Sequence, residues 1–90
     1  MNYKHLQDML IHIPDLPKLG MTALQIGKLS WPGHRKTDEQ RARHAAAVLR
    51  ALHRIGCVQT MPCIGRSIYW NTDKGRAMRR RMREEASRGA

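Results

Sequence analysis

Side chains able to read the edges of base pairs gather near the start of a helical segment that follows Thr37. They are Gln40, Arg41, Arg43 and His44. Arginine can pair with both hydrogen-bond acceptors of guanine in the major groove of DNA, and glutamine can pair in a similar way with adenine. These residue types within two helical turns therefore have the chemistry of base recognition. A solvated basic helix face is the competing interpretation.

Further basic residues flank this segment along the chain. His34, Arg35 and Lys36 precede the expected helix start, where backbone N–H groups and added positive charge suit a phosphate. Incidental charge on a loop would look the same. Arg50 follows two turns later on the basic side of the helix. We therefore expect these four residues to extend a nucleic-acid contact beyond the first two turns.

The sequence gives little support for a catalytic or metal-binding site. The seven carboxylates are dispersed, and no glycine-rich phosphate loop is present. Cys57 and Cys63 are separated by five residues, without the closely spaced cysteine pair of structural zinc sites, and we expect reduced thiols. We expect no enzyme activity, no metal and no cofactor.

Length and charge favour one small domain with a polyanionic partner. The 90 residues carry a net charge of +10, of which +9 falls on residues 34–90. The longest uninterrupted apolar stretch is five residues, against roughly 20 for a membrane-spanning helix, and no signal-peptide pattern stands at the N-terminus. We expect a single cytoplasmic domain over residues 1–90, frayed at 86–90, without membrane contact.

Apolar periodicity predicts three helices in the first 56 residues. The first covers about 3–13, the second 21–30 and the third begins after Thr37. Thr22 with Gln25, and Thr37 with Gln40, each form the pattern of a capping box. The expected inward-facing residues include Leu29 of the second helix and, for the third, Val48, Leu49, Leu52 and Ile55.

The period then changes from helical to alternating. Residues 57–61 and 67–71 predict two strands of a hairpin with its turn in 62–66, and a last helix follows over about 73–86. Arg66, beside Gly65 at the hairpin tip, is suited to a phosphate or to the minor groove. In the last helix, Ala77, Met78 and Met82 are expected to face inward, and its arginines to be largely solvated.

This order of elements resembles the winged helix-turn-helix superfamily. Residues 48–58 are similar to the end of its recognition helix, which closes on glycine and enters an apolar strand. Residues 68–76 look like the passage from wing to last helix in the multiple-antibiotic-resistance-type bacterial regulators, with Asn71 where that family usually has leucine. The resemblance implies an α+β, mainly α fold: a three-helix bundle, a β-hairpin wing and a C-terminal helix.

It also implies sequence-specific binding to double-stranded DNA, as in a small transcriptional regulator of a bacterium, phage or mobile element. A homodimer through the first and last helices is compatible with this expectation. The alternative is a protein-interaction module, whose basic face binds an acidic host or partner protein. Binding to structured RNA is a third interpretation, for which no motif argues specifically.

Overall fold

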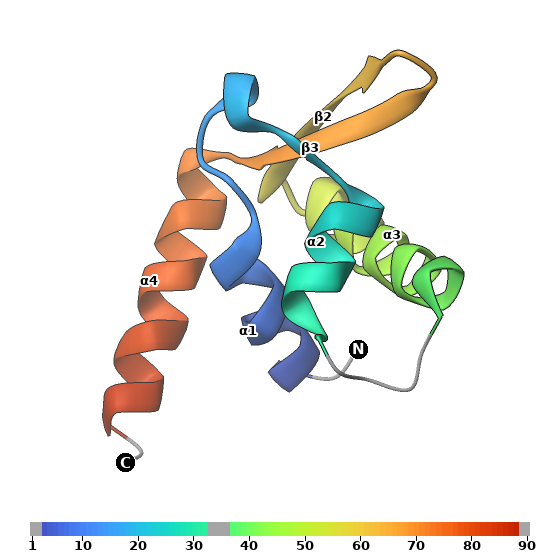
Figure 1. Ribbon diagram of the computed structural model, residues 1–90. Coiled ribbons are helices and arrows are strands. Elements are labelled where there is room, and N and C mark those ends of the chain that lie inside the picture. The colour runs from blue at the N-terminus through green and yellow to red at the C-terminus, as the bar shows by residue number, and fades with distance from the viewer. Residues whose placement is uncertain (1–2, 33–36, 89–90) are drawn as a thin grey trace.

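The computed structural model describes residues 3–32 and 37–88, which form four α-helices, a short 3₁₀ helix and three strands (Figure 1). In chain order the elements are α1 (Tyr3–His12), η1 (Pro17–Leu19), β1 (Met21–Thr22), α2 (Ala23–Ser30), α3 (Asp38–Arg54), β2 (Val58–Cys63), β3 (Arg66–Asn71) and α4 (Asp73–Arg88). The expectation of an α+β, mainly α fold is confirmed. None of the helices in these ranges is long and apolar enough to span a bilayer.

The three strands form one antiparallel sheet in the order β1-β3-β2. The β2–β3 pairing runs from Val58 opposite Asn71 to Cys63 opposite Arg66. On its other edge, β3 pairs with β1 at only two positions. The pattern of the sequence did not predict β1, because a two-residue strand is too short to show alternation.

Local side-chain hydrogen bonds fix where α2 and α3 begin. At each start a threonine hydroxyl accepts from the backbone N–H three residues later, and the glutamine there accepts from the threonine's own N–H at 2.9 Å. Both predicted capping boxes, Thr22 with Gln25 and Thr37 with Gln40, are confirmed. After α3, Gly56 adopts φ +83°, the left-handed conformation that commonly follows a helix end.

The hydrophobic core lies where α1, α2, α3, the start of β2 and α4 meet. α2 and α3 are the most extensively packed pair of helices. The core residues are Met9, Leu10, Ile13, Ile26, Trp31, Ala45, Val48, Leu49, Leu52, Cys57, Val58 and Met82. Burial of this apolar surface is the main stabilising contribution to such a fold.

Three of the expected inward-facing residues are not buried. Leu29 and Ile55 are 45% and 46% exposed, and Ala77 is exposed on α4. Ile55 follows the last helical residue of α3, so its side chain no longer continues the buried stripe. Helical spacing alone therefore predicted the burial of these residues wrongly, because it does not show how far along a helix the neighbouring elements extend.

The hairpin is longer than predicted and its turn is tighter. Only Ile64 and Gly65 separate the last strand pair, and their φ values are +47° and +75°. Positive φ at both central residues is the requirement of the type I′ turn, which matches strand twist and usually carries Asn-Gly. Isoleucine in this region costs about 1–2 kcal/mol because its Cβ crowds the backbone. The fold therefore carries local strain at the hairpin tip.

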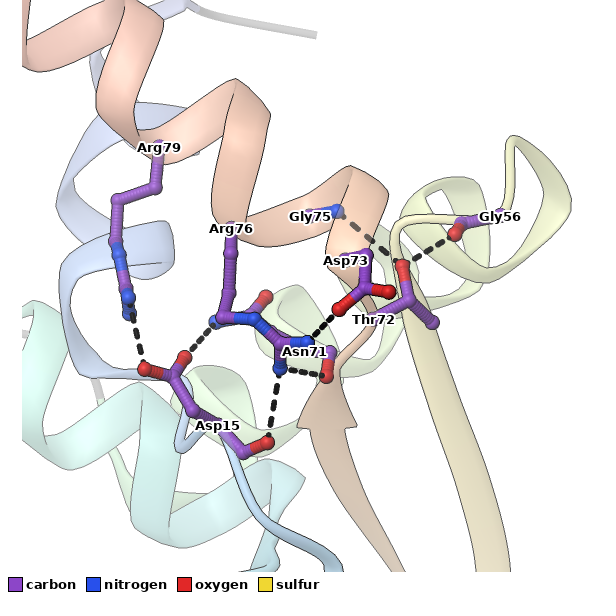
Figure 2. Close-up of polar contacts among 8 residues, drawn as sticks. All are labelled: Asp15, Gly56, Asn71, Thr72, Asp73, Gly75, Arg76 and Arg79. Carbon is purple, nitrogen blue, oxygen red and sulfur yellow. Dashed lines mark hydrogen bonds and ion pairs between the residues drawn. The ribbon is translucent and has the colours of Figure 1, made fainter.

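A polar cluster joins the segment after α1 to the β3–α4 junction (Figure 2). Buried Asn71 donates from its side chain to the Ile13 carbonyl at 3.0 Å and to the Asp15 carboxylate at 3.2 Å. Its own carbonyl accepts from Arg76, which also donates to the Asp15 carbonyl and pairs with Asp73. Asn71 thus connects two distant parts of the chain.

The first turn of α4 packs directly on the chain that leaves α3. A Cβ atom on Gly75 would lie 2.0 Å from the Cys57 carbonyl oxygen, closer than any side chain allows. The Thr72 hydroxyl donates to the Gly56 carbonyl at 2.6 Å and accepts from the Gly75 N–H at 3.2 Å (Figure 2). Glycine at position 75 is therefore required by close backbone packing.

Candidate nucleic-acid interface

A continuous exposed stripe runs along α3 on the side opposite its buried residues. Its spacing of three and four residues follows the helical repeat. The stripe consists of Gln40, Arg43, Ala47, Arg50 and Arg54, all exposed. We call these five residues the α3 stripe. It carries three arginines and no carboxylate, so it presents positive charge along most of the helix.

The N-terminal half of the α3 stripe borders a shallow depression. Its lining residues are Gln40, Arg43, His44 and Ala47. The small side chain of Ala47 leaves room between longer neighbours, so a partner can approach the helix closely there. Three of the four residues predicted to read bases are thus brought together on one open surface.

Gln40 already has a structural role at this surface. Its side-chain oxygen accepts the Thr37 backbone N–H at 2.9 Å as part of the capping box. Adenine recognition by glutamine uses the amide oxygen and nitrogen together. Base contact of that kind would require the Gln40 oxygen to leave the cap.

Arg43 is held only weakly. Its guanidinium lies 2.9 Å from Glu39, one turn earlier, and both side chains are more than three-quarters exposed. Exposed ion pairs of this kind contribute about 0–1 kcal/mol, so a phosphate or guanine can replace the carboxylate at small cost. Arg43 is therefore well placed to contact an anionic partner.

Arg41 differs from the prediction, because its side chain faces α2 and not the solvent. Its Nε donates to the Trp31 carbonyl at 3.2 Å, its Nη1 donates to Asp38 at 3.2 Å, and only 15% of the side chain is exposed. A Cβ on Gly27 of α2 would lie 2.8 Å from the Arg41 carbonyl oxygen, so the two helices are in close contact here. Arg41 positions α3 against α2 and does not belong to the α3 stripe.

The sequence already indicated that Arg41 faces inward. Arg41 stands four residues before Ala45 and seven before Val48, which places it on the buried side of the helix. His44 is intermediate in burial, and its ring lies 4.5 Å from the Trp31 ring, centroid to centroid. His44 therefore lies at the boundary between the α2–α3 contact and the open surface.

Arg66 is exposed beside the hairpin tip, as predicted. A second depression connects it to the start of α2, and its lining residues are Thr22, Ala23, Leu24, Arg66, Ser67 and Tyr69. The sequence pattern did not indicate this proximity, because it depends on the pairing of β1 with β3. The predicted phosphate contacts His34, Arg35 and Lys36 lie outside the described residues.

The arginines of α4 divide into two groups. Arg76 and Arg79 hold Asp15 and were wrongly expected to be largely solvated, whereas Arg80, Arg81 and Arg83 are exposed. α4 lies on the opposite side of the molecule from α3 (Figure 1). The exposed α4 arginines are therefore separate from the α3 stripe.

The titratable groups with shifted pKa values lie away from the α3 stripe. The hydrogen bond from Arg79 lowers the pKa of the Asp15 carboxyl, against the opposing effect of burial and with a further contribution from Asn71. Burial raises the pKa of the Cys57 thiol, and Cys63 is a free thiol exposed on β2. Within residues 3–32 and 37–88, no three His, Cys, Asp or Glu side chains are grouped so as to hold a metal ion.

The α3 stripe and Arg66 thus define the candidate interface, with chemistry suited to phosphates and base edges. Comparison of the chain with protein-family models, curated proteins and solved structures finds no match.

Proposed function

We propose that this chain is a winged helix-turn-helix protein that binds double-stranded DNA sequence-specifically. In this proposal α3 enters the major groove and the β2–β3 hairpin is the wing. The observation that carries the proposal is the α3 stripe, an exposed face with three arginines and no carboxylate on a well-anchored helix. Such a face has the charge for phosphates and the donors for base edges.

The arrangement of elements supports this role. α3 packs along α2 and is followed directly by the hairpin, which extends beyond the helices on the side of the molecule where α3 lies (Figure 1). In winged helix-turn-helix proteins the corresponding helix and hairpin contact the same duplex. Arg66 then reaches a phosphate or the minor groove next to the segment that α3 occupies.

The biological role that fits is a small transcriptional regulator of a bacterium, phage or mobile element. Such a protein acts by occupying its site. A homodimer through α1 and α4 would read two half-sites spaced by one helical turn of DNA. Selection of bound duplexes from a random pool tests both points, because it yields the preferred sequence and any two-fold spacing.

Binding of a mixed-sequence duplex over a salt series tests the DNA contact itself. The variant Arg43→Gln/Arg50→Gln/Arg66→Gln removes three exposed arginines from the interface. If each contacts a phosphate, the slope of log K against log salt becomes shallower by about 2 to 3, since each lost contact contributes about 0.9. The matched control Arg80→Gln/Arg81→Gln/Arg83→Gln removes the same charge from α4. On a duplex short enough for a single protomer, where a dimer contact through α4 does not contribute, it is expected to change the slope by less than half as much.

If the two triple variants changed the salt slope equally, duplex binding would be explained by net charge alone and not by a specific interface on α3 and the hairpin. Negligible duplex binding by the wild-type chain at moderate salt would overturn it. Capture of one acidic protein from nuclease-treated extract would then favour the protein-interaction alternative, and preference for structured RNA in direct competition would favour the RNA alternative.

A further inference from the structure

The hairpin tip presents an apolar side chain that the fold itself does not use. Ile64 is 98% exposed, and every residue from 61 to 67 is exposed. A Cβ placed on the neighbouring Gly65 would meet nothing within 4 Å. No packing compensates for exposing this isoleucine to water, so its side chain is available to contact a partner.

The backbone conformation of Ile64 is a second unfavourable feature at the tip, independent of its exposure. Ile64 has φ +47°, a conformation that β-branched residues strongly disfavour and that asparagine or glycine adopts readily. Backbone outliers of this kind tend to persist at functional positions. An isoleucine that is both strained and exposed thus has two unfavourable features at one position of a two-residue turn.

The surroundings of Ile64 indicate the chemistry of its partner. Arg66 is exposed next to the turn, and residues 57–71 contain no Asp or Glu. Pro62 lies on β2, an edge strand, and offers no N–H for pairing with a further strand. A fully exposed apolar side chain beside a cation, on a hairpin without negative charge, fits a polyanion that has an apolar interior. Stacked base pairs between two phosphate backbones have this composition.

The dimensions of the hairpin restrict how it can enter DNA. The minor groove is about 6 Å wide, whereas two paired strands are already about 4.8 Å apart before their side chains are counted. The body of the hairpin therefore stays outside an undistorted groove, and only the tip side chain can enter. Apolar side chains that enter the minor groove in this way partly unstack a base step and kink the duplex.

We infer that Ile64 inserts at a base step in the minor groove and bends the DNA, with Arg66 on the adjacent phosphate. This inference rests on the proposed function and adds an architectural consequence to it. It also predicts that flexible pyrimidine–purine steps are preferred under the hairpin tip, at positions that α3 does not contact.

The test uses the full chain with duplexes of about 30 base pairs, enriched by the wild type from a random pool and labelled at both ends for energy transfer. The wild-type chain is expected to shorten the end-to-end distance. Ile64→Asn, which suits the turn better, is expected to abolish most of this shortening and to weaken binding roughly tenfold. Leu19→Asn, a comparable substitution at an exposed position of η1, is expected to leave bending intact.

The outcomes separate the inference from the proposed function. Tight binding with no bending by the wild type, or bending that Ile64→Asn leaves unchanged, would overturn the inference while DNA binding stands. Failure of the wild type to enrich any duplex would remove both. Because residue 64 has no packed neighbours to lose, loss of bending in a normally folded Ile64→Asn chain supports insertion directly.

Discussion

The Asp15 carboxylate and the Arg79 guanidinium lie 2.9 Å apart, although the two residues are 64 positions apart in the chain. The contact joins the segment after α1 to the middle of α4, and Asn71 and Arg76 bind the same acidic residue from the β3–α4 junction (Figure 2). α4 is thereby fixed to the first half of the chain by polar contacts as well as by Met82 in the core.

This pairing predicts acid sensitivity. The pKa of Asp15 is lowered in the folded chain, chiefly by its hydrogen bond from Arg79, so the stabilisation is complete above the unfolded value and is lost as pH falls through the folded value. The effect therefore appears below about pH 5. Because the Asp15 side chain is 40% exposed, solvent screening limits the contribution to about 1 kcal/mol or less.

Asp15→Asn is expected to lower the free energy of unfolding at pH 7 and to flatten its fall between about pH 5 and pH 2. Urea unfolding at a series of pH values measures both. Glu84→Gln, at an exposed position of α4, is the control and should leave the acid dependence close to that of the wild type. An unchanged slope in Asp15→Asn would show that other carboxylates carry the acid sensitivity.

Close packing at the start of α4 gives a second prediction. Gly75→Ala places a methyl group 2.0 Å from the Cys57 carbonyl oxygen and 2.8 Å from the Asn71 side-chain oxygen, so the backbone must move. We expect a loss of about 3 kcal/mol in the free energy of unfolding, measured in urea. Gly65→Ala meets no neighbour and should cost only the strain of its positive φ, about 1 kcal/mol. Equal losses would contradict the steric explanation.

Arg41 and Arg43 are expected to separate stability from binding. Arg41→Gln removes the hydrogen bond to the Trp31 carbonyl and should cost about 1–2 kcal/mol, with little change in the salt slope of duplex binding. Arg43→Gln breaks only an exposed ion pair, so stability should stay within about 0.5 kcal/mol while the slope becomes shallower by about 0.9. If Arg41→Gln made the slope shallower and left stability unchanged, Arg41 would have to be counted among the DNA-contacting residues.

The features that sequence reasoning predicted well are local ones. The capping boxes of Thr22 and Thr37 each involve residues three apart, and the change from helical to alternating period marks the hairpin directly. By contrast, the contacts of Asp15 with Arg79 and of Arg41 with Trp31 depend on how separate elements pack. A charged residue that pairs across such a distance looks in the sequence like any solvated charge.

The interface shows the same division. Arg43, Arg50 and Arg66 are exposed where the pattern placed them, because their surroundings follow from one helix and one hairpin. The depression between Arg66 and the start of α2 could not be anticipated, since it requires the pairing of β1 with β3. The strain at Ile64 was also hidden, because the expected turn of five residues did not force that residue into a left-handed conformation.

That strain gives the last prediction. Ile64→Asn replaces a β-branched residue at φ +47° by one that adopts this region readily, and no core contact is lost because Ile64 is 98% exposed. The free energy of unfolding should therefore rise by about 1 kcal/mol in urea. Ile64→Val keeps the branched Cβ and is expected to show no comparable gain. A more stable Asn variant that binds and bends DNA less well would mean that Ile64 lowers the stability of the hairpin in return for contact with DNA at the tip. An Asn variant no more stable than the wild type would show that the turn accommodates Ile64 without a cost in folding free energy.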